Sequence, residues 1–360
     1  MHYPQILERT GDRARVSPPT HARAIRERNR ALVLRTLMER STASRADLSR
    51  FTGLARPTIS EVVRDLLDEG VLRETGPSQD ARPGKPAVML EFDQRAVQVI
   101  ALDLSVPGHV TAALATPDGR VEHRTTRALA ADPAAAIAAL AERLASVADS
   151  RPLGIGIGAP TGSPALLGLG PRLAETLGLD VHVFDDADLV ADAEQRFGTV
   201  GTDFLLVRLG TRIGTAIRVV GDDGAPVERS IGARELAHVV AGGDPGDRCP
   251  CGRDGCVHAW AAAPALRRRL DGADADAVLA EAGARLGTSL SVIAAAVDLP
   301  TILLSGPSDI ATPSLAEATA AAVRAASHPS LGPVVERSTL DDAVLRGAAT
   351  RVVAAAFSPR

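Results

Sequence analysis

The sequence has no long uninterrupted run of apolar residues. No apolar segment near Met1 has the length that a signal peptide needs, and none elsewhere reaches the roughly 20 apolar residues of a membrane-spanning helix. We therefore expect a cytoplasmic protein without a membrane span. Cysteine is also scarce. Its three residues cannot all pair with one another, and the cytoplasm keeps thiols reduced, so we do not expect a disulfide framework.

Neither sign of charge is in large excess, but charge is unevenly distributed along the chain. The formal net charge is -4, yet residues 1–95 contain 17 basic and 13 acidic residues, and the remainder contains 23 and 31. The N-terminal part is thus the candidate for binding a polyanion, although such a surplus also occurs on ordinary solvated surfaces. With 360 residues, 45% hydrophobic and 23% charged, the chain is predicted to be globular, with two or three domains.

The first 93 residues predict an arm followed by a small helical domain. Residues 1–20 contain three prolines and no periodic apolar pattern, which indicates a flexible arm. Residues 21–93 predict three helices and then two strands joined by a loop rich in proline, glycine and basic residues. Capping and helix-breaking residues set the bounds of the second and third helices: Ser44, Gly53, Ala55 and Gly70. This order is that of a winged helix-turn-helix, which places its second motif helix in the major groove of DNA.

Polar residues on the predicted third helix form the candidate surface for reading DNA. Arginine can bond guanine with two hydrogen bonds, and serine or threonine can donate to phosphate. The residues that we expect to contact DNA in this domain are Ser44, Arg45, Arg56, Thr58, Ser60 and Arg64. Arg82 and Lys85, the one lysine of the chain, would place the loop between the strands against the DNA backbone. The alternative is a helical protein-interaction domain with a solvated basic loop.

Residues 94–360 predict an α/β domain with two related lobes. Residues 96–129 indicate strand, turn, strand, Asp-Gly turn and strand, and residues 202–230 repeat this plan with a second Asp-Gly turn at Asp223 and Gly224. Alanine-rich segments predict helices over 132–148, 188–197, 274–297, 313–327 and 341–356. Two lobes of this kind predict a ligand-binding cleft between them.

The three cysteines lie within eight residues, which is the most specific signal in the sequence. Cys249, Cys251 and Cys256 follow a Cys-x-Cys-x4-Cys pattern in which two glycines permit a tight turn. A structural zinc ion takes four ligands in a tetrahedron, so one ligand is missing, and His238 and His258 are both candidates for it. The alternative is three buried and unreactive cysteines.

Two further groups of polar residues are candidates for binding a ligand. Glu235 and His238 are three residues apart, which places both on one face of a helix or turn. Asp185 and Asp186 end a predicted strand immediately before a helix. A carboxylate at this position is either a functional group or simply the helix cap, a role in which aspartate is favoured.

Taken together, these motifs resemble the ROK proteins, the family of repressors, open reading frames and sugar kinases, over nearly the whole chain. The matching segments, in chain order, are "RNRALVLRTLMERSTASRADLSRFTGLARPTISEVVRDLLDEGVL", "ARPGKP", "GIGIGAP", "DDADLVADAE", "LGTRIG", "ELAH" and "CPCGRDGCVHAW". The resemblance implies an actin-like or hexokinase-like fold of two lobes that bind a sugar between them. It also implies a zinc ion held by His238, Cys249, Cys251 and Cys256, and dimers or tetramers that bind DNA.

The resemblance also assigns expected roles to single residues. Asp186 matches the catalytic aspartate of the family, which takes a proton from a sugar hydroxyl during phosphoryl transfer. Asp185 stands where the kinases have a sugar-binding asparagine, and Glu235 and His238 match residues that contact the sugar. His258 stands where a sugar-binding glutamate is usual. The second phosphate loop of the family corresponds to Gly210, Thr211 and Gly214.

Several departures from the family pattern argue against kinase activity. The first phosphate motif, Asp-x-Gly-Gly-Thr-Lys, is replaced by "DLSVPG" at Asp103–Gly108, in which Pro107 removes a backbone donor. Arg212 replaces a glycine of the second loop, and a Gly-Gly nucleotide turn is replaced by Ser305 and Gly306. Phosphoryl transfer depends on positioning and neutralising phosphate, so we expect that the protein is not an enzyme.

The effector is less well defined by the sequence. Only about 20 residues separate Thr161 from Val181, fewer than the family uses to supply a sugar-contacting loop. His258 has three interpretations: it hydrogen-bonds a sugar or sugar phosphate, it is an alternative zinc ligand, or it fills space. We predict a repressor that binds an inverted DNA repeat and responds to a sugar or sugar-phosphate effector. The alternatives are a sugar kinase with a DNA-binding arm and a regulator whose sugar pocket no longer works.

Overall fold

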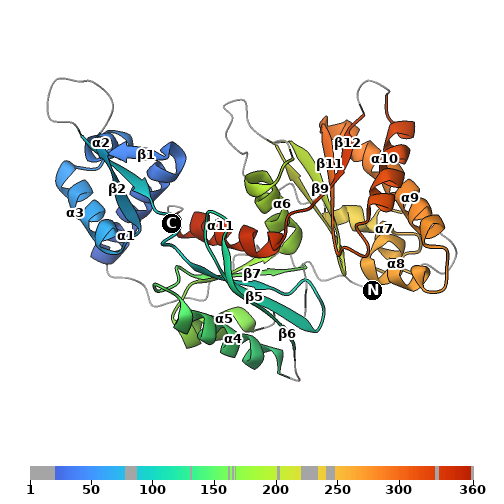
Figure 1. Cartoon of the computed structure of the whole chain (residues 1–360), viewed down its shortest axis with the longest axis horizontal. Coiled ribbons are helices and arrows are strands. Elements are labelled where there is room, and N and C mark those ends of the chain that lie inside the picture. The colour runs from blue at the N-terminus through green and yellow to red at the C-terminus, as the bar shows by residue number, and fades with distance from the viewer. Residues whose placement is uncertain are drawn as a thin grey trace.

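The structure is a computed structural model that describes most of the chain. The described residues are 21–77, 87–129, 132–160, 163, 166, 168–200, 203–219, 234–240, 248–328 and 332–357. The predicted arm at residues 1–20 and the loop with Arg82 and Lys85 lie outside these ranges, as does the second Asp-Gly turn. Figure 1 shows three parts: a small N-terminal head and two α/β lobes. The α/β class and the winged helix-turn-helix predicted from the sequence are confirmed.

The head comprises residues 21–77 and 87–92. Its elements are α1 (His21–Arg40), β1 (Thr42–Ser44), α2 (Arg45–Thr52), α3 (Arg56–Asp68), β2 (Leu72–Pro77) and β3 (Val88–Phe92). The helices pack around a buried apolar core, and the three strands pair antiparallel in the order β1-β3-β2. The sequence did not predict β1, because three residues are too few to produce a strand pattern.

Caps fix the turn between α2 and α3. The Ser44 hydroxyl accepts a hydrogen bond from the backbone N–H of Asp47, and the Asp47 carboxylate accepts one from the backbone N–H of Ser44, which is a complete capping box. Gly53 ends α2 with φ of +71°, a conformation that glycine adopts without strain. Ala55 precedes α3, with a proline in its first turn, as the sequence predicts.

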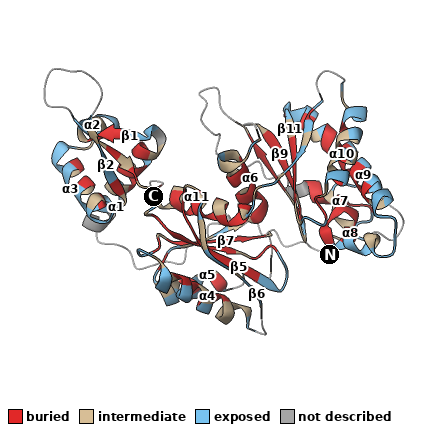
Figure 2. Cartoon of the chain, viewed as in Figure 1, coloured by how far each residue is buried: buried red, intermediate tan, exposed pale blue. Residues whose placement is uncertain are grey.

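The first lobe is a five-stranded sheet covered on both faces. Its elements are β4 (Val99–Asp103), β5 (His109–Ala115), β6 (Val121–Ala128), α4 (Pro133–Val147), β7 (Ile155–Ala159), α5 (Leu169–Leu177), β8 (Val181–Asp185), α6 (Asp186–Phe197) and α11 (Ala343–Phe357). The strand order is β6-β5-β4-β7-β8, with β4, β7 and β8 parallel. Helices α4 and α5 bury one face of the sheet, and α6 and α11 share the core on the other face (Figure 2).

The second lobe is a four-stranded sheet in the order β10-β9-β11-β12. Its elements are β9 (Phe204–Leu209), β10 (Ile213–Arg218), the 3-10 helix η2 (Arg234–His238), α7 (Val257–Ala261), α8 (Ala263–Leu270), α9 (Ala275–Val297), β11 (Thr301–Ser305), α10 (Pro313–Ala326) and β12 (Val334–Arg337). The long helices stand where the sequence predicts them. The short helices α5 and α8 were not predicted, because eight or nine residues give little periodicity.

One apolar core runs from the head into both lobes. Buried residues of the head, α11, α6 and one face of the second sheet belong to a single cluster. Figure 1 shows α11 between the head and the sheet of the first lobe, and α1 contacts α11. The Phe92 ring at the end of β3 meets the Phe357 ring of α11 edge to face, with centroids 5.9 Å apart. The head is thus packed on the last helix of the chain.

Among the described helices, α9 alone is long and apolar enough, by length and composition, to cross a membrane. It packs along α10, and the approach is close enough that Gly283 and Gly287 of α9 face Ala318 and Ala322 of α10. In this structure α9 is a helix of the second lobe.

Candidate functional site

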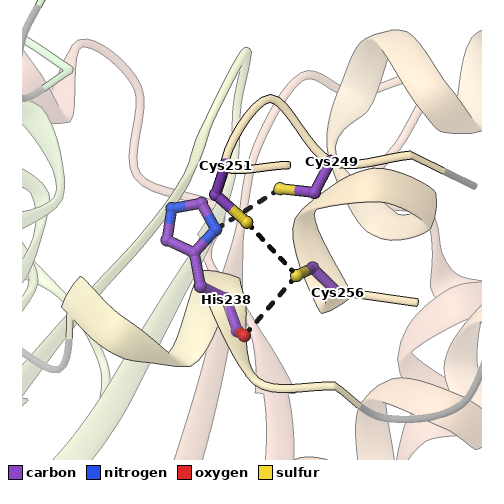
Figure 3. Close-up of side chains that lie close together, drawn as sticks. All are labelled: His238, Cys249, Cys251 and Cys256. Carbon is purple, nitrogen blue, oxygen red and sulfur yellow. Dashed lines mark hydrogen bonds between the residues drawn. The ribbon is translucent and has the colours of Figure 1, made fainter. Parts of the chain in front are cut away.

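The three cysteines and one histidine converge beside the second lobe. His238 ends η2, Cys249 and Cys251 lie on a tight loop, and Cys256 immediately precedes α7 (Figure 3). The loop closes through two backbone hydrogen bonds: the N–H of Cys249 donates to the carbonyl of Arg253 at 2.9 Å, and that of Gly252 donates to the carbonyl of Cys249 at 2.8 Å. Gly252 has a φ of +91°, so the turn itself requires glycine.

The distances within this cluster fit a tetrahedral metal ion. The Sγ of Cys249 lies 3.4 Å from Nδ1 of His238, and the Sγ atoms of Cys251 and Cys256 are 3.6 Å apart. All four ligand atoms lie within 4.8 Å of one another. Metal–sulfur and metal–nitrogen bonds of tetrahedral zinc place neighbouring ligand atoms about 3.5 to 3.8 Å apart. This cluster of one histidine and three cysteines can therefore bind a metal ion.

The thiols of the cluster differ in acidity. Hydrogen bonding from the backbone N–H of Arg253 lowers the pKa of Cys251 to about 6. Burial raises the pKa of Cys256 to about 12 and also raises that of Cys249. Metals bind the thiolate form, so Cys251 is the ligand that is ionised most readily near neutral pH.

His258 lies beside the cluster but does not belong to it. Its ring centroid is 6.0 Å from that of His238, with the two planes tilted by 46°. Burial lowers the pKa of His258, and the charge of Arg212 and the neighbouring His238 lower it further. The geometry selects His238 as the fourth member of the metal cluster and places His258 on the adjacent turn of α7, near the β9–β10 turn.

The two adjacent aspartates have different positions and different partners. Asp185 is the N-cap of α6, and its Oδ1 accepts a hydrogen bond from the backbone N–H of Ala187 at 3.1 Å. Asp186 is the first residue of the helix, and 6% of its side chain is exposed. Its Oδ2 accepts a hydrogen bond from Nε of Arg208 at 2.7 Å. The capping alternative thus applies to Asp185, whereas Asp186 forms a buried ion pair.

Arg208 is a residue of the site that the sequence did not identify. It lies on β9, between apolar neighbours, and it interacts electrostatically with three carboxylates of the first lobe, on β4, β8 and α6. Burial acts to lower its pKa, but the charges of Asp186 and Asp103 outweigh this effect and raise it. For Asp103 burial has the opposite effect and raises the pKa, although the charge of Arg208 opposes this change. We name Asp103, Asp186 and Arg208 the interlobe cluster. The sequence signal that could have identified Arg208 is a charged residue within the otherwise apolar strand "FLLVRL".

The two loops that stand at the positions of the family's phosphate loops touch one another. The Thr211 hydroxyl donates to the backbone carbonyl of Ser105 at 3.2 Å, across the two lobes. The N–H of Ser105 in turn donates to Oδ1 of Asp103 at 2.8 Å. Gly214 has no room for a side chain, because a Cβ there would lie 2.7 Å from that of Ala187 in α6. The sheet of the second lobe is therefore packed directly against the start of α6.

The ligand contacts expected of two groups of residues stay predictions. Glu235 belongs to η2, whose last residue is His238, but its side chain lies outside the described part of the chain. The sugar contacts expected of Asp185, Asp186, His238 and His258 are likewise untested. What the structure adds is that η2 and α7 come together at the metal cluster, because Val240 and Cys256 form a β-bridge.

The head presents one polar face of α3 to solvent. Arg56, Ser60 and Arg64 are exposed at intervals of one helical turn, along one side of the buried stripe that contains Ile59 and Val63. Thr58 is half-buried.

Two other predicted DNA contacts have partners inside the head. The Ser44 hydroxyl is used in the capping box of α2, and the Ser44 side chain is buried. Arg45 pairs with Glu74 of β2 at 3.2 Å. Neither observation tests contact with DNA, so both contacts stay predictions. Those of Arg82 and Lys85 also stay predictions, because they lie outside the described residues.

Comparison with protein families places the two parts of the chain. The model described as "ROK family" matches residues 110–354, and the model described as "Winged helix-turn-helix DNA-binding" matches residues 26–73. The chain belongs to the ROK family. The family resemblance inferred from the sequence is thereby confirmed.

Several curated proteins resemble this ROK protein. The xylose repressor of Caldicellulosiruptor bescii is 25% identical over 265 residues, which are 67% of this chain and 65% of that protein. The xylose repressor of Bacillus subtilis is 24% identical over 68% of both chains. The repressor Mlc of Escherichia coli is 26% identical over 69% of this chain and 66% of that one. The matches thus span about two thirds of each relative.

Solved structures show the same fold. A ROK family transcriptional regulator described as a homologue of Escherichia coli Mlc superposes with a TM-score of 0.71 at 23% identity, covering 93% of this chain and 97% of that one. A ROK glucokinase from Streptomyces griseus, solved with glucose and AMPPNP, has a TM-score of 0.57 at 20% identity and covers 70% of this chain and 98% of the enzyme.

Proposed function

We propose that this ROK protein is a DNA-binding transcriptional repressor whose two lobes bind a sugar or sugar-derivative effector. The observation that carries the proposal is the continuous apolar core from the head through α11 to α6. Helix α6 begins at Asp186, in the interlobe cluster, and the head carries the exposed arginines of α3. A change in the arrangement of the lobes at Asp186 can thus be transmitted through packed side chains of α6 and α11 to the DNA-binding surface of the head.

The repressor proposal also draws on the relatives. Two of the similar proteins are named xylose repressors and a third is named a DNA-binding transcriptional repressor. We propose that the protein acts in the cytoplasm as a homodimer or homotetramer on an inverted DNA repeat, with one head on each half-site. The effector must bind the DNA-competent and DNA-incompetent forms unequally, because only unequal affinity shifts the equilibrium between them.

We propose zinc as the metal at the cluster of His238, Cys249, Cys251 and Cys256. Three thiolates and one imidazole are the donor set that structural zinc prefers, and the four donors leave no open position for catalysis. The ion would hold η2 to the loop before α7 and so fix the placement of Glu235 and His258. The proposed role is structural and positioning.

We further propose that the protein does not transfer phosphate. Phosphoryl transfer requires backbone donors and cations arranged around the phosphates. Here Pro107 lacks the backbone N–H, and the Thr211 hydroxyl bonds to the opposite loop. Asp186, at the position of the catalytic base, is bound to Arg208.

One experiment tests the function as a whole. The full-length protein selects DNA from a random pool, and the selected site is then titrated with protein in the presence of D-xylose, D-glucose or their phosphate esters. We expect selection of an inverted repeat and at least tenfold weaker binding with one of these compounds. If no sequence is enriched, the DNA-binding proposal is wrong. An enriched site that no compound affects favours the ligand-independent regulator, and ADP release from MgATP with a sugar favours the kinase.

A further inference from the structure

Arg208 is one of the residues through which the second lobe contacts the first. It belongs to β9 of the second lobe, but its Nε is 2.7 Å from Oδ2 of Asp186, at the start of α6. Only 15% of the Arg208 side chain and 6% of the Asp186 side chain are exposed. Asp103, which ends β4 of the first lobe, interacts electrostatically with the same guanidinium group. A single buried cation is thus shared by carboxylates of β4 and α6.

A second hydrogen bond joins the two lobes, between the loop that follows β9 and the loop that follows β4. The Thr211 hydroxyl, two residues beyond the end of β9, donates to the Ser105 carbonyl, two residues beyond the end of β4. These two loops stand where the family has the segments that hold nucleotide phosphates. The chain's own groups therefore bond to one another where the family pattern calls for contacts to phosphate, and the residues present do not fit a nucleotide.

We propose that Arg208 is the counter-ion of an internal lock, which holds the two lobes together without nucleotide or divalent cation and positions the Asp186 carboxylate for the effector. The lock itself is independent of the effector's identity. Its second role, in effector binding, rests on the proposed function above.

The physical reason is the cost of burying carboxylates. An ionised carboxylate in a poorly solvated site needs a nearby cation or several hydrogen-bond donors, and a lone buried charge is strongly destabilising. In phosphoryl-transfer enzymes metal ions held by aspartates supply that positive charge. Here a covalently attached guanidinium group supplies it permanently. The lobes need no bound cofactor to bring Asp103 and Asp186 together.

The lock also determines which atoms of Asp186 a ligand can use. Oδ2 is occupied by Arg208, whereas Oδ1 has no hydrogen bond to any residue in the described ranges. In the proposed scheme a hydroxyl group of a sugar donates to Oδ1. Asp186 is then an acceptor held in a fixed orientation, and effector binding requires neither Mg²⁺ nor ATP. Arg208 is a positioning residue in this scheme.

The lock is tested by removing the positive charge of Arg208 and then restoring the balance of charge with a second substitution. Arg208→Gln leaves two buried carboxylates without a cation, and we expect the Tm of the full-length protein to fall by roughly 5 to 10 °C. Arg208→Lys keeps the charge and should recover part of the loss. Arg208→Gln with Asp186→Asn removes the pair together and should recover most of it. If the double variant is no more stable than Arg208→Gln, the counter-ion role is wrong.

The second buried arginine of the same sheet supplies a matched control. Arg218 on β10 donates to Asp192 of α6 at 2.8 Å, and 4% of its side chain is exposed. When Arg218 is removed, Asp192 retains a second partner, Arg351 of α11. The other carboxylate beside Arg218 is that of Asp188, 3.5 Å away, and 21% of its side chain is exposed. We expect Arg208→Gln, but not Arg218→Gln, to gain stability as the pH falls from about 8 to about 5, because protonation then relieves the unpaired carboxylates. Identical pH profiles for the two variants would overturn the proposal.

Calorimetry separates the lock from the proposed effector response. MgADP should show no binding to the wild-type protein, and a Kd for D-xylose or D-glucose should be unchanged by MgADP and weakened at least tenfold by Arg208→Gln. Sugar binding that depends on MgADP contradicts the inference. If neither sugar nor its phosphate ester binds the wild-type protein, the proposed effector response fails, and the rescue experiment still decides the role of Arg208.

Discussion

The edge-to-face contact between Phe92 and Phe357 joins the first domain of the chain to its last helix. Phe92 ends the third strand of the head, Phe357 ends α11, and both side chains are nearly fully buried. Helix α11 also binds α6 through the Arg351–Asp192 pair. The head is therefore anchored to the element that carries Asp186.

Truncating this contact should loosen the head. Phe357→Ala removes a buried ring and an aromatic pair, for a loss of about 3 to 5 kcal/mol in the free energy of unfolding. We expect the variant still to bind its DNA site, but with an affinity that the effector no longer changes. Urea unfolding and DNA titration with and without effector measure the two effects. A variant of full stability and full response contradicts the coupling route.

Replacing one cysteine of the cluster should release the metal. Cys251→Ser removes the thiol of lowest pKa from a set of four ligands, and we expect one equivalent of zinc to be lost together with thermal stability or effector response. Elemental analysis and a chelator-dependent Tm provide the measurement. His258→Ala is the control, since His258 lies outside the ligand group and this variant should keep its metal. A Cys251→Ser protein that retains zinc and response would refute the proposed site.

The exposed face of α3 should carry sequence recognition. Arg56→Ala is expected to weaken binding to the selected DNA by about 1 to 3 kcal/mol, because a bidentate contact with a base would be lost. Circular dichroism should show an unchanged fold. Arg172→Ala, an exposed arginine of α5 in the first lobe, is the control and should bind as tightly as wild type. Equal affinities for all three proteins would place the DNA contact elsewhere.

The raised pKa of Asp103 should make stability depend on pH. Burial raises its pKa above the ordinary value of 3.8, so the folded protein holds this proton more tightly than the unfolded chain does. Its contribution to stability is present at low pH and is lost as the pH rises from about 3.8 through the folded pKa. Asp103→Asn should therefore gain stability relative to wild type as the pH rises from about 4 to about 8.

The measurement for Asp103 is the difference between the two unfolding free energies at each pH. Groups that face Asp103, chiefly Arg208 and Asp186, are present in both proteins, so their own titration largely cancels. A stability difference that stays constant over this range, or that falls as the pH rises, would show that the pKa of Asp103 is not raised in the folded protein.

The sequence alone determined much of the local structure. The spacing of three cysteines predicted the metal cluster, because closely spaced ligands with glycines between them converge without help from distant elements. Helix caps at Ser44 and Gly53 and the apolar stripe of α3 predicted the head for the same reason. The long helices of the lobes followed from periodicity. Each of these features depends on residues near one another in the chain.

Only the tertiary structure decided which distant residues meet. Asp185 and Asp186 are neighbours in the sequence, yet one caps a helix and the other forms an ion pair with Arg208, 22 residues further on. Phe92 and Phe357, which are in contact, lie 265 positions apart in the sequence. Such pairs arise when sheets and helices pack, and packing depends on shape and burial over the entire fold, which no local pattern records.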